Sequence, residues 1–431
     1  MKTIKTLLVA TLGLLVLVSC EHTEKQITNP KDYQAFLDIK ENKGLNFTLE
    51  EIKFWEAKYQ SDTVQKSYLG IIAAKYSTLF QYTGEIKDLY KADELLSKSN
   101  KASDYSKVGT LRSLARNYIS QHRFKEALVL ADKALVIGEG KAESQKLLFD
   151  VQMELGNYDI ALKNLEAIKD MNDYDYLIRL AKWNDHKGDL DTAITFMEKA
   201  RTIAEKEDNK TLKIWSYSNL GDFYGHAGRV QDSYDSYLKT LSIDPNYTYA
   251  LKGIAWIVFS HERNTQEAKR IIETIERTHS TPDFLLLKSD ISSFEGKQDE
   301  AKNYKIAYFD LLAKNNYGAM YNKYNTLIYA DEKITATKAL EIAKVEVDHR
   351  PTPDSYDLLA WSYLNTGDAK KALAIANEKV VGKSHEPHIQ YHLAMIYKAN
   401  NEIDKVIPLK KELSTSIYEL GPSFAQKIEN L

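Results

Sequence analysis

The sequence predicts an all-α fold in which pairs of helices stack side by side as a solenoid, and three observations predict it. The 431 residues include only 18 glycines and 8 prolines, so turns and strand corners are scarce. Hydrophobic residues make up 43% and aromatic residues 11% of the chain, which excludes a disordered protein because there is ample apolar surface to bury. A pattern of small and apolar residues also recurs about every 34 residues. Such a chain grows by adding units to an array, so its length does not imply two or three separate domains.

Residues 1–19 have the three-part order of an export signal peptide. Lys2 and Lys5 precede an apolar run over residues 7–18, which is too short to cross about 30 Å of hydrocarbon as a permanent anchor. The run ends in the sequence LVSC at residues 17–20, and this ending resembles the lipobox of bacterial lipoproteins. The resemblance implies cleavage before Cys20 and acylation of its thiol and new amino terminus. The alternative, a buried spare thiol in a cytosolic protein, leaves the charged and apolar segments unexplained.

Cys20 is the only cysteine of the chain, so neither disulfides nor cysteine catalysis is expected. Residues 20–30 comprise this acylated cysteine and a polar stretch that ends in Asn-Pro, which we interpret as a flexible tether. Several acyl chains contribute about 0.8 kcal/mol for each buried methylene, enough to hold a water-soluble body on a bilayer. We therefore expect a lipid-anchored protein of the cell envelope, in the outer membrane, with the leaflet left open.

The two ends of the remaining chain are expected to cap the helical array. Residues 31–66 are predicted to form a helical cap on the first repeat, because Thr48 and Glu51 have capping-box spacing before an apolar segment. Residues 408–431 are predicted to form a closing C-terminal helix, interrupted near Gly421-Pro422.

Residues 67–407, between these ends, carry about eight to ten copies of one pattern. The clearest copy has the segment YSNLGDFY at residues 217–224, then Gly228, Tyr237 and Asp244-Pro245. This pattern resembles the tetratricopeptide repeat, and the resemblance implies a right-handed superhelix of antiparallel helix pairs. The marker positions in the first helix of each copy recur with nearly even spacing, at 77, 115, 149, 181, 221, 255, 289, 327, 360 and 394.

Small residues at fixed points of the pattern allow close helix packing. Gly221 on a first helix and Ala193 on a second helix have almost no side chain, so two backbones can approach to about 8 Å. Replacing either by Leu is expected to overpack the contact and to cost roughly 1 to 3 kcal/mol of stability. The turns within the pairs carry a glycine that can end a helix in the left-handed conformation, at positions 156, 188, 228 and 367.

The tetratricopeptide resemblance also implies a binding surface. In this family the first helices line the inner wall of the superhelix, and that wall binds extended peptides or partner helices. The early repeats would present charged residues there and the late repeats aromatic residues, which together with arginine dominate interface energies. The partner-binding residues implied by the pattern are Arg112, Arg116, Lys146, Lys182, Trp215, Asn219, Tyr249, Lys252, Trp256, Tyr321, Tyr324, Asn325, Trp361 and Tyr391.

We expect these residues to face a long curved groove that is open to solvent. The alternative for any single aromatic residue is packing between repeats, as tryptophan and tyrosine do in most helical arrays. Asn219 and Asn325 resemble the asparagine with which carboxylate-clamp members of the family hold a peptide backbone. The lysines that accompany it there do not recur in step here, so binding of chaperone tails is not implied.

No motif of the sequence predicts an enzyme, a metal site or a cofactor. His388 and His392 are four residues apart and could share a metal, but their order is not the His-Glu-x-x-His of metalloproteases, so a structural role is preferred. Phosphate-binding glycine loops and serine nucleophile elbows are absent from the sequence. The formal net charge of −3 gives no global attraction for nucleic acid, so we expect no nucleic-acid partner.

Two functions remain open at this point. The preferred hypothesis is a membrane-anchored envelope lipoprotein whose inner wall binds another envelope protein or peptide. The alternative is an outer-membrane lipoprotein that binds a nutrient or glycan through its aromatic residues, since starch-utilisation lipoproteins also contain tetratricopeptide helices. Those proteins carry long insertions between repeats, whereas the repeats here run almost without interruption.

Overall fold

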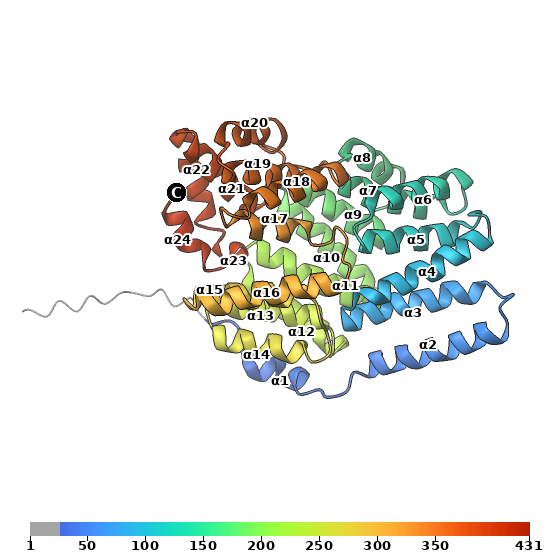
Figure 1. Cartoon of the computed structure of the whole chain (residues 1–431). Helices are drawn as coiled ribbons and strands as arrows, with labels where there is room; N and C mark the ends of the chain where they lie inside the picture. Colours follow the sequence, from blue (N-terminus) through green and yellow to red (C-terminus); the bar gives the residue numbers. More distant parts are fainter. Residues whose placement is uncertain (1–25) are drawn as a thin grey trace, which may run out of the picture.

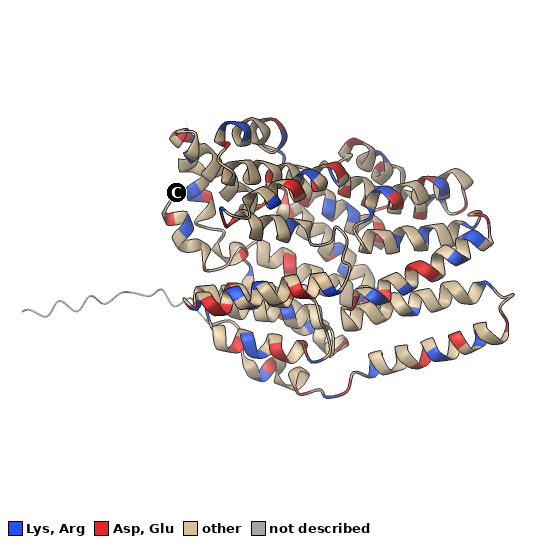
Figure 2. Ribbon diagram, in the orientation of Figure 1, with Lys and Arg blue, Asp and Glu red and all other residues tan. Residues whose placement is uncertain are grey.

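The computed structural model describes residues 26–431, and within them every regular element is a helix (Figure 1). The predicted signal peptide, Cys20 and the first part of the tether lie outside the described residues. None of the described helices is both long and apolar enough to cross a bilayer. Acidic and basic residues are interspersed over the helices (Figure 2), in keeping with the nearly balanced composition.

Ten successive helix pairs form the body of the described chain, and the two helices of each pair pack on each other. The pairs are α3 (Ser67–Thr83) with α4 (Ile86–Ala102), α5 (Val108–Ser120) with α6 (Phe124–Ile137), α7 (Lys141–Glu154) with α8 (Tyr158–Ala167), α9 (Tyr174–His186) with α10 (Leu190–Lys206), α11 (Lys210–His226) with α12 (Val230–Ile243), α13 (Thr248–Ser260) with α14 (Thr265–Ile275), α15 (Pro282–Phe294) with α16 (Gln298–Lys314), α17 (Asn322–Ala330) with α18 (Ala336–His349), α19 (Pro353–Asn365) with α20 (Ala369–Lys379), and α21 (Pro387–Ala399) with α22 (Ile403–Leu413). The fold is an all-α solenoid, as the sequence predicted.

The local chemistry of each pair follows the repeat pattern. All ten marker positions, from 77 to 394, fall in the first helix of a pair. Ala115 and Ala193 are fully buried where neighbouring helices meet, because a methyl side chain keeps the backbones close. The turn glycines at 156, 188, 228 and 367 all have φ between +71° and +94°, a left-handed conformation that ends the first helix and reverses the chain.

After one superhelical turn, the array packs against its own earlier repeats. Arg350 Nη2 donates to Glu154 Oε2 at 2.6 Å across a separation of 196 residues. Ser280 N donates to Thr83 O at 2.8 Å across nearly the same separation. One superhelical turn therefore takes about six repeats, and the second turn lies directly on the first. The expectation of a groove open along its whole length is wrong, because contacts between the turns bridge it at these places.

Gly156 is a contact point between the two turns, so we expect it to tolerate a side chain less well than Gly367. A Cβ at Gly156 would lie 2.8 Å from Pro351 O, whereas a Cβ at Gly367 would meet nothing within 4 Å. Both residues have positive φ, so alanine is strained at either position. Gly156→Ala should therefore cost about 1 to 2 kcal/mol more in urea unfolding than Gly367→Ala. Equal losses for the two variants would contradict direct contact between the turns.

The N-terminal region is divided between two places. α2 (Lys43–Ser61) packs on α3 as a cap, but it begins after the N-cap Asn42. The predicted capping box at Thr48 is wrong, because Thr48 lies inside the helix and its hydroxyl donates to Gly44 O. Asn42 supplies the cap instead, since its side chain accepts from Leu45 N.

α1 (Pro30–Leu37) docks on the middle of the array, against α12 and α14, and not on the first repeat. Tyr33 is fully buried there and its hydroxyl donates to Glu267 Oε1 at 2.7 Å. Glu262 accepts from the backbone nitrogens of Ile27 and Thr28. The predicted tether is therefore too long at its C-terminal end, because residues 27–30 are held against the body.

The C-terminal end also differs from the prediction. α22 includes Pro408 and ends at Leu413, so the repeats continue past residue 407 and the closing segment begins later. Two short helices follow in place of one closing helix, α23 (Ile417–Leu420) and α24 (Phe424–Glu429), separated by Gly421 with φ +87°. α23 contacts α11, α13 and α21, so the chain turns back into the superhelix.

Candidate interaction groove

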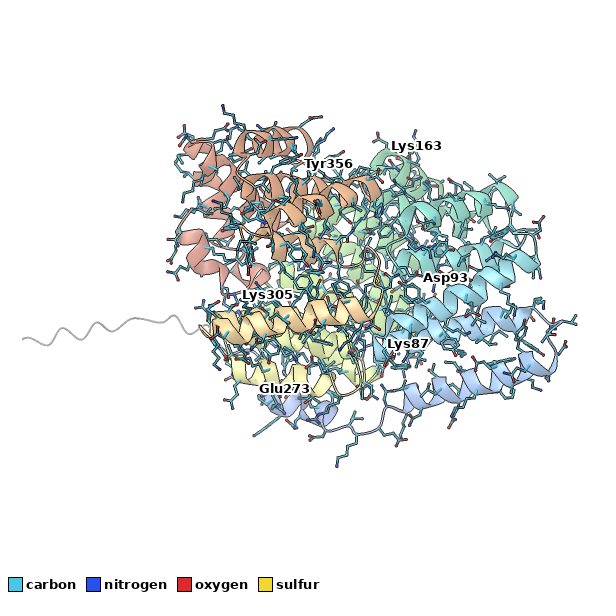
Figure 3. The ribbon with its side chains drawn as sticks, in the orientation of Figure 1. Lys87, Asp93, Lys163, Glu273, Lys305 and Tyr356 are labelled. Atoms are coloured by element: carbon cyan, nitrogen blue, oxygen red, sulfur yellow. The ribbon has the colours of Figure 1, made fainter. Side chains whose placement is uncertain are left out.

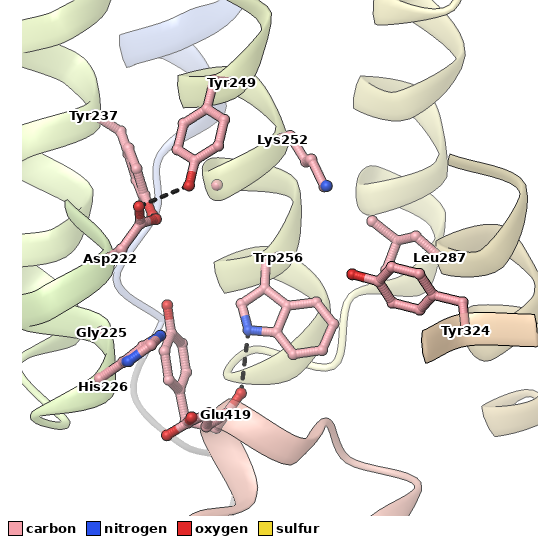
Figure 4. Close-up of a pocket in the computed structure, with 12 residues that line it drawn as sticks. Asp222, Gly225, His226, Tyr237, Tyr249, Lys252, Trp256, Leu287, Tyr324 and Glu419 are labelled. Atoms are coloured by element: carbon pink, nitrogen blue, oxygen red, sulfur yellow. Dashed lines mark hydrogen bonds between the residues drawn. The ribbon is translucent and has the colours of Figure 1, made fainter. Parts of the chain in front are cut away.

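A hollow of about 420 Å³ lies on the inner wall of the superhelix (Figure 4). Its walls come from α11, α12, α13, α15, α17 and α23, so helices far apart in sequence share it. Its lining residues are Asp222, Gly225, His226, Tyr237, Tyr249, Lys252, Gly253, Trp256, Leu287, Tyr324, Tyr418 and Glu419. We call this hollow the inner groove.

Two glycines shape one wall of the inner groove. A Cβ at Gly221 or at Gly253 would lie 2.4 Å from the ring of Tyr237, so this ring fits between α11 and α13 only because both residues are glycine. The Tyr237 hydroxyl thereby reaches the groove and donates to Asp222 Oδ1 at 2.6 Å. Tyr249 donates to Asp222 Oδ2 at 2.7 Å (Figure 4). Burial raises the pKa of Asp222, while the two hydroxyl donors oppose this rise.

Several polar groups face the inner groove without an internal partner. Among the described residues, Lys252 and Glu419 form no ion pair, in contrast to Arg179, Lys269 and Arg350. Burial and the carboxylates of Glu386 and Asp185 raise the pKa of Glu419, while His226 opposes the rise. These groups are oriented by the wall and available to a ligand, which is the usual character of a binding site.

Trp256 holds the C-terminal segment in the inner groove. Its indole Nε1 donates to Tyr418 O at 3.1 Å, and Ser260 Oγ donates to the same carbonyl. The ring of Tyr418 packs on Gly225, where a Cβ would lie 2.9 Å from it. The inner wall therefore already binds a short segment of backbone with one aromatic side chain.

A second hollow of about 290 Å³ continues from the first, and the two share His226 and Glu419. Acidic side chains from four parts of the chain line it, namely Asp185, Asp354, Glu386 and Glu412. Burial raises the pKa of Asp185 and of Glu386. The part of the inner wall next to α23 is thus rich in carboxylates.

The charged residues predicted for the early repeats are mostly engaged within the wall. Lys146 is buried between Asp173 and Asp175, and Lys182 Nζ pairs with Glu154 Oε1 at 3.0 Å. Arg112 donates to the backbone carbonyls of Glu139 and Gly140. Arg116 remains exposed. For Lys146 the prediction of a wall-facing side chain is wrong, because its ammonium group is enclosed by the carboxylates that neutralise it.

The predicted aromatic residues divide into two groups. Trp215, Tyr249 and Tyr324 are between 36% and 48% exposed, and Trp256 is half-buried beneath the C-terminal segment. Tyr249, Lys252, Trp256 and Tyr324 meet in the inner groove. In contrast, Tyr321, Trp361 and Tyr391 are buried. The prediction that these three residues face an open wall is therefore wrong. These three fill space between repeats, the alternative that the sequence left open for each aromatic residue.

The two predicted asparagines make local contacts. Asn219 Nδ2 donates to Trp215 O, and Asn325 Oδ1 accepts from Tyr308 OH. Neither side-chain amide is directed to hold a peptide backbone in the manner of a carboxylate clamp.

The histidine pair lies in the core between the ninth and tenth helix pairs. His392 Nδ1 lies 2.7 Å from Asp357 Oδ2, both side chains are 2% exposed, and Trp361 stacks on the imidazole at 4.0 Å. Burial lowers the pKa of His392 and raises that of Asp357. Among residues 26–431 no group of three or more His, Cys, Asp or Glu side chains could hold a metal ion.

Sequence reasoning missed Asp222, His226, Tyr418 and Glu419 as residues of the groove. Asp222 follows the packing glycine of the clearest repeat, which was a usable signal for a wall-facing position. Tyr418 and Glu419 carried no such signal, because they lie outside the repeats and reach the groove only through the turn after Leu413.

Comparison with known proteins gives similarity of fold only. No protein-family model matches the sequence, and no curated protein sequence matches it. A human IFIT1 dimer with m7Gppp-AAAA aligns with a TM-score of 0.46 and 12% identity over 72% of this chain and 70% of that chain. Pseudomonas aeruginosa pilF aligns with a TM-score of 0.36 and 16% identity over 50% of this chain and 95% of that chain, and MamA with 0.29 and 21% over 38% and 95%.

These similarities carry no functional argument, and the chain's own ten hairpins define its architecture. The fold is a tetratricopeptide-like α-solenoid. In this solenoid the inner wall, and not a loop or a sheet edge, brings together residues from many repeats.

Proposed function

We propose that this protein is an envelope lipoprotein that acts as an interaction scaffold, holding a partner protein or peptide on its inner wall. The observation that carries the proposal is the inner groove, where Lys252 and Glu419 stand unpaired beside exposed aromatic rings. Oriented aromatic and charged groups that lack internal partners are typical of interaction sites. The early repeats provide little of this surface, because three of the four charged residues predicted there, Arg112, Lys146 and Lys182, are engaged within the wall.

The sequence supports the membrane anchor, and the structure bears only on the length of the tether. Residues 1–20 combine basic, apolar and lipobox-like segments, and Ile27 and Thr28 are already bound to Glu262. The tether would therefore consist of residues 21–26, a short connection that keeps the body near the bilayer. We propose the outer membrane as its place, in either leaflet.

The anchor is tested by Cys20→Ala in cells fed a labelled palmitate. The unchanged protein should take up the label and sediment with membranes, whereas the Cys20→Ala variant should do neither, because the acceptor thiol is lost. Val136→Ala, on the exposed side of α6, serves as the control and should behave as the unchanged protein. A label retained in the Cys20→Ala variant would contradict lipidation at this residue.

The scaffold role is tested by a photoreactive phenylalanine analogue at position 324 or 249, with position 136 as the control. Tyr324 and Tyr249 face the inner groove, whereas Val136 is 86% exposed elsewhere. Irradiation of intact cells should cross-link one protein species from the groove positions and none from position 136. A glycan array with the purified chain provides the second arm. Saccharide binding without any cross-linked protein would favour the glycan alternative and overturn the scaffold.

A further inference from the structure

The C-terminal segment 414–423, which we call the strap, sits in the inner groove as a bound peptide would. After α22 the chain leaves the outer repeats, enters the superhelix and contacts α11, α13 and α21 through α23. The inner groove is thus partly occupied by this chain's own residues (Figure 4).

The contacts that hold the strap recognise a backbone and one aromatic ring. Trp256 Nε1 and Ser260 Oγ both donate to the carbonyl of Tyr418, and such contacts accept any residue at that position of a ligand. The Tyr418 ring rests on Gly225, where the absence of a side chain makes the seat for an aromatic group. The chemistry of recognition is therefore that of a short helical turn with an aromatic anchor.

The strap has two buried residues, Gly421 and Pro422, and both follow its helix. No residue of α23 is fully buried, in contrast to every paired helix of the array. Elements with few buried apolar contacts have the lowest free energies of local opening in a protein. Opening of the strap should therefore cost less free energy than opening of a paired helix.

Glu419 of the strap lies close to other carboxylates when the strap is seated. It follows the anchor Tyr418 and lines the second hollow together with Asp185 from α9 and Glu386 from the start of α21. His226 from α11 lines the same hollow, and the charges of His226 and of Lys323 from α17 oppose those of the carboxylates. Glu386 itself is drawn toward its neutral form by burial and by Asp354. A lysine or arginine at the position of Glu419 would meet these carboxylates as a partner and not as a like charge.

The strap also leaves room in the groove. The hollow of about 420 Å³ remains beside Tyr418, between Lys252, Leu287 and Tyr324. A partner segment that continued past the anchor residue would bury this surface, which the strap leaves uncovered.

We propose that the inner groove binds a short segment of a partner protein in which an aromatic residue is followed by a basic residue, and that the strap occupies this seat until such a segment displaces it. This inference rests on the proposed scaffold function and adds the recognition chemistry of its site. It predicts competition between strap and partner for the hydrogen bonds of Trp256 and Ser260.

The test uses the full chain with Tyr418→Ala, which removes the strap's anchor and leaves the ten helix pairs in place. Three fluorescent peptides of residues 414–423 are titrated by anisotropy: the natural sequence, one with Glu419→Lys and one with Tyr418→Ala. We expect the Glu419→Lys peptide to bind about tenfold more tightly than the natural peptide at low salt, with a smaller gain at high salt because the carboxylates are screened. The Tyr418→Ala peptide should not bind.

The unchanged chain should bind the natural and the Glu419→Lys peptides about tenfold more weakly than the Tyr418→Ala chain does, because its own strap competes. Tyr356→Ala removes a half-buried tyrosine from α19 (Figure 3), away from the residues that line either hollow, and this control should match the unchanged chain. Gly225→Val in the Tyr418→Ala chain should abolish binding, since its side chain fills the anchor seat.

Equal affinities of the natural and Glu419→Lys peptides, or equal binding by the unchanged and Tyr418→Ala chains, would overturn the inference. Far-ultraviolet circular dichroism melts of each variant establish that the array is intact. Failure of the scaffold function itself is distinguishable, because it would remove the cross-linked partner at position 324, whereas failure of this inference alone would leave that partner in place.

Discussion

Gly221→Leu is expected to lower the free energy of unfolding by about 3 kcal/mol, at the upper end of the cost of overpacking. The reason is the position of Tyr237, whose ring is already 2.4 Å from the place of a Cβ on Gly221 and equally close to that of Gly253. A larger residue at 221 cannot push the ring away from α11 without driving it into α13. The Tyr237 hydroxyl would also leave Asp222, so one wall of the inner groove would change with the stability.

The loss is measured by urea unfolding, with Trp fluorescence and circular dichroism followed together because repeat arrays can unfold in parts. Gly109→Leu is the control, since Gly109 is an exposed helical glycine whose Cβ would meet nothing within 4 Å. The control should lose no stability, because leucine has the better helix propensity. If both variants unfold at the same urea concentration, close packing around Tyr237 is not what joins α11 to α13.

Asp357→Leu is expected to cost about 3 to 5 kcal/mol, the range for removing one partner of a buried pair. Asp357 on α19 and His392 on α21 are both almost fully enclosed, so the variant leaves His392 Nδ1 without its partner and without water. The ninth and tenth helix pairs meet at this contact, and the imidazole supports Trp361 by stacking.

The double variant Asp357→Leu with His392→Phe should recover most of this loss, because no buried polar group then remains unpaired and phenylalanine can still stack on Trp361. Urea unfolding of the two single variants and the double variant forms the cycle that isolates the coupling. Additive losses would show that the pair contributes only through packing. Added zinc should change none of the four curves, since the hydrogen bond between Asp357 and His392 already occupies the Nδ1 of His392.

The sequence predicted the parts of the fold that depend on neighbouring residues. The turn glycines, the close contacts at Ala115 and Ala193 and the ten marker positions each reflect a requirement within one hairpin or between adjacent hairpins. Such requirements recur in every hairpin and can be recognised from a single chain. Part of the groove was predictable for the same reason, because Tyr249, Lys252, Trp256 and Tyr324 occupy equivalent faces of first helices.

Errors arose where side chains meet across repeats or outside them. Trp361 and Tyr391 share the pattern positions of wall residues, yet they turn into the core formed with His392 and the C-terminal helices. Lys146 has the spacing of an exposed cation, but carboxylates from the next repeat enclose it. The pattern gives the helix face of a residue, whereas its exposure depends on what the neighbouring elements place over that face.

The sequence by itself determined the repeating helical hairpin, its small contact residues and the left-handed glycines of its turns, because these are short-range requirements of backbone and packing. Only the tertiary structure decided that residues some 196 positions apart meet, that the second superhelical turn packs on the first and that Tyr418 lies on Gly225. The physical reason is cumulative: the pitch of a superhelix is the sum of small rotations at every repeat, and no single repeat encodes that sum.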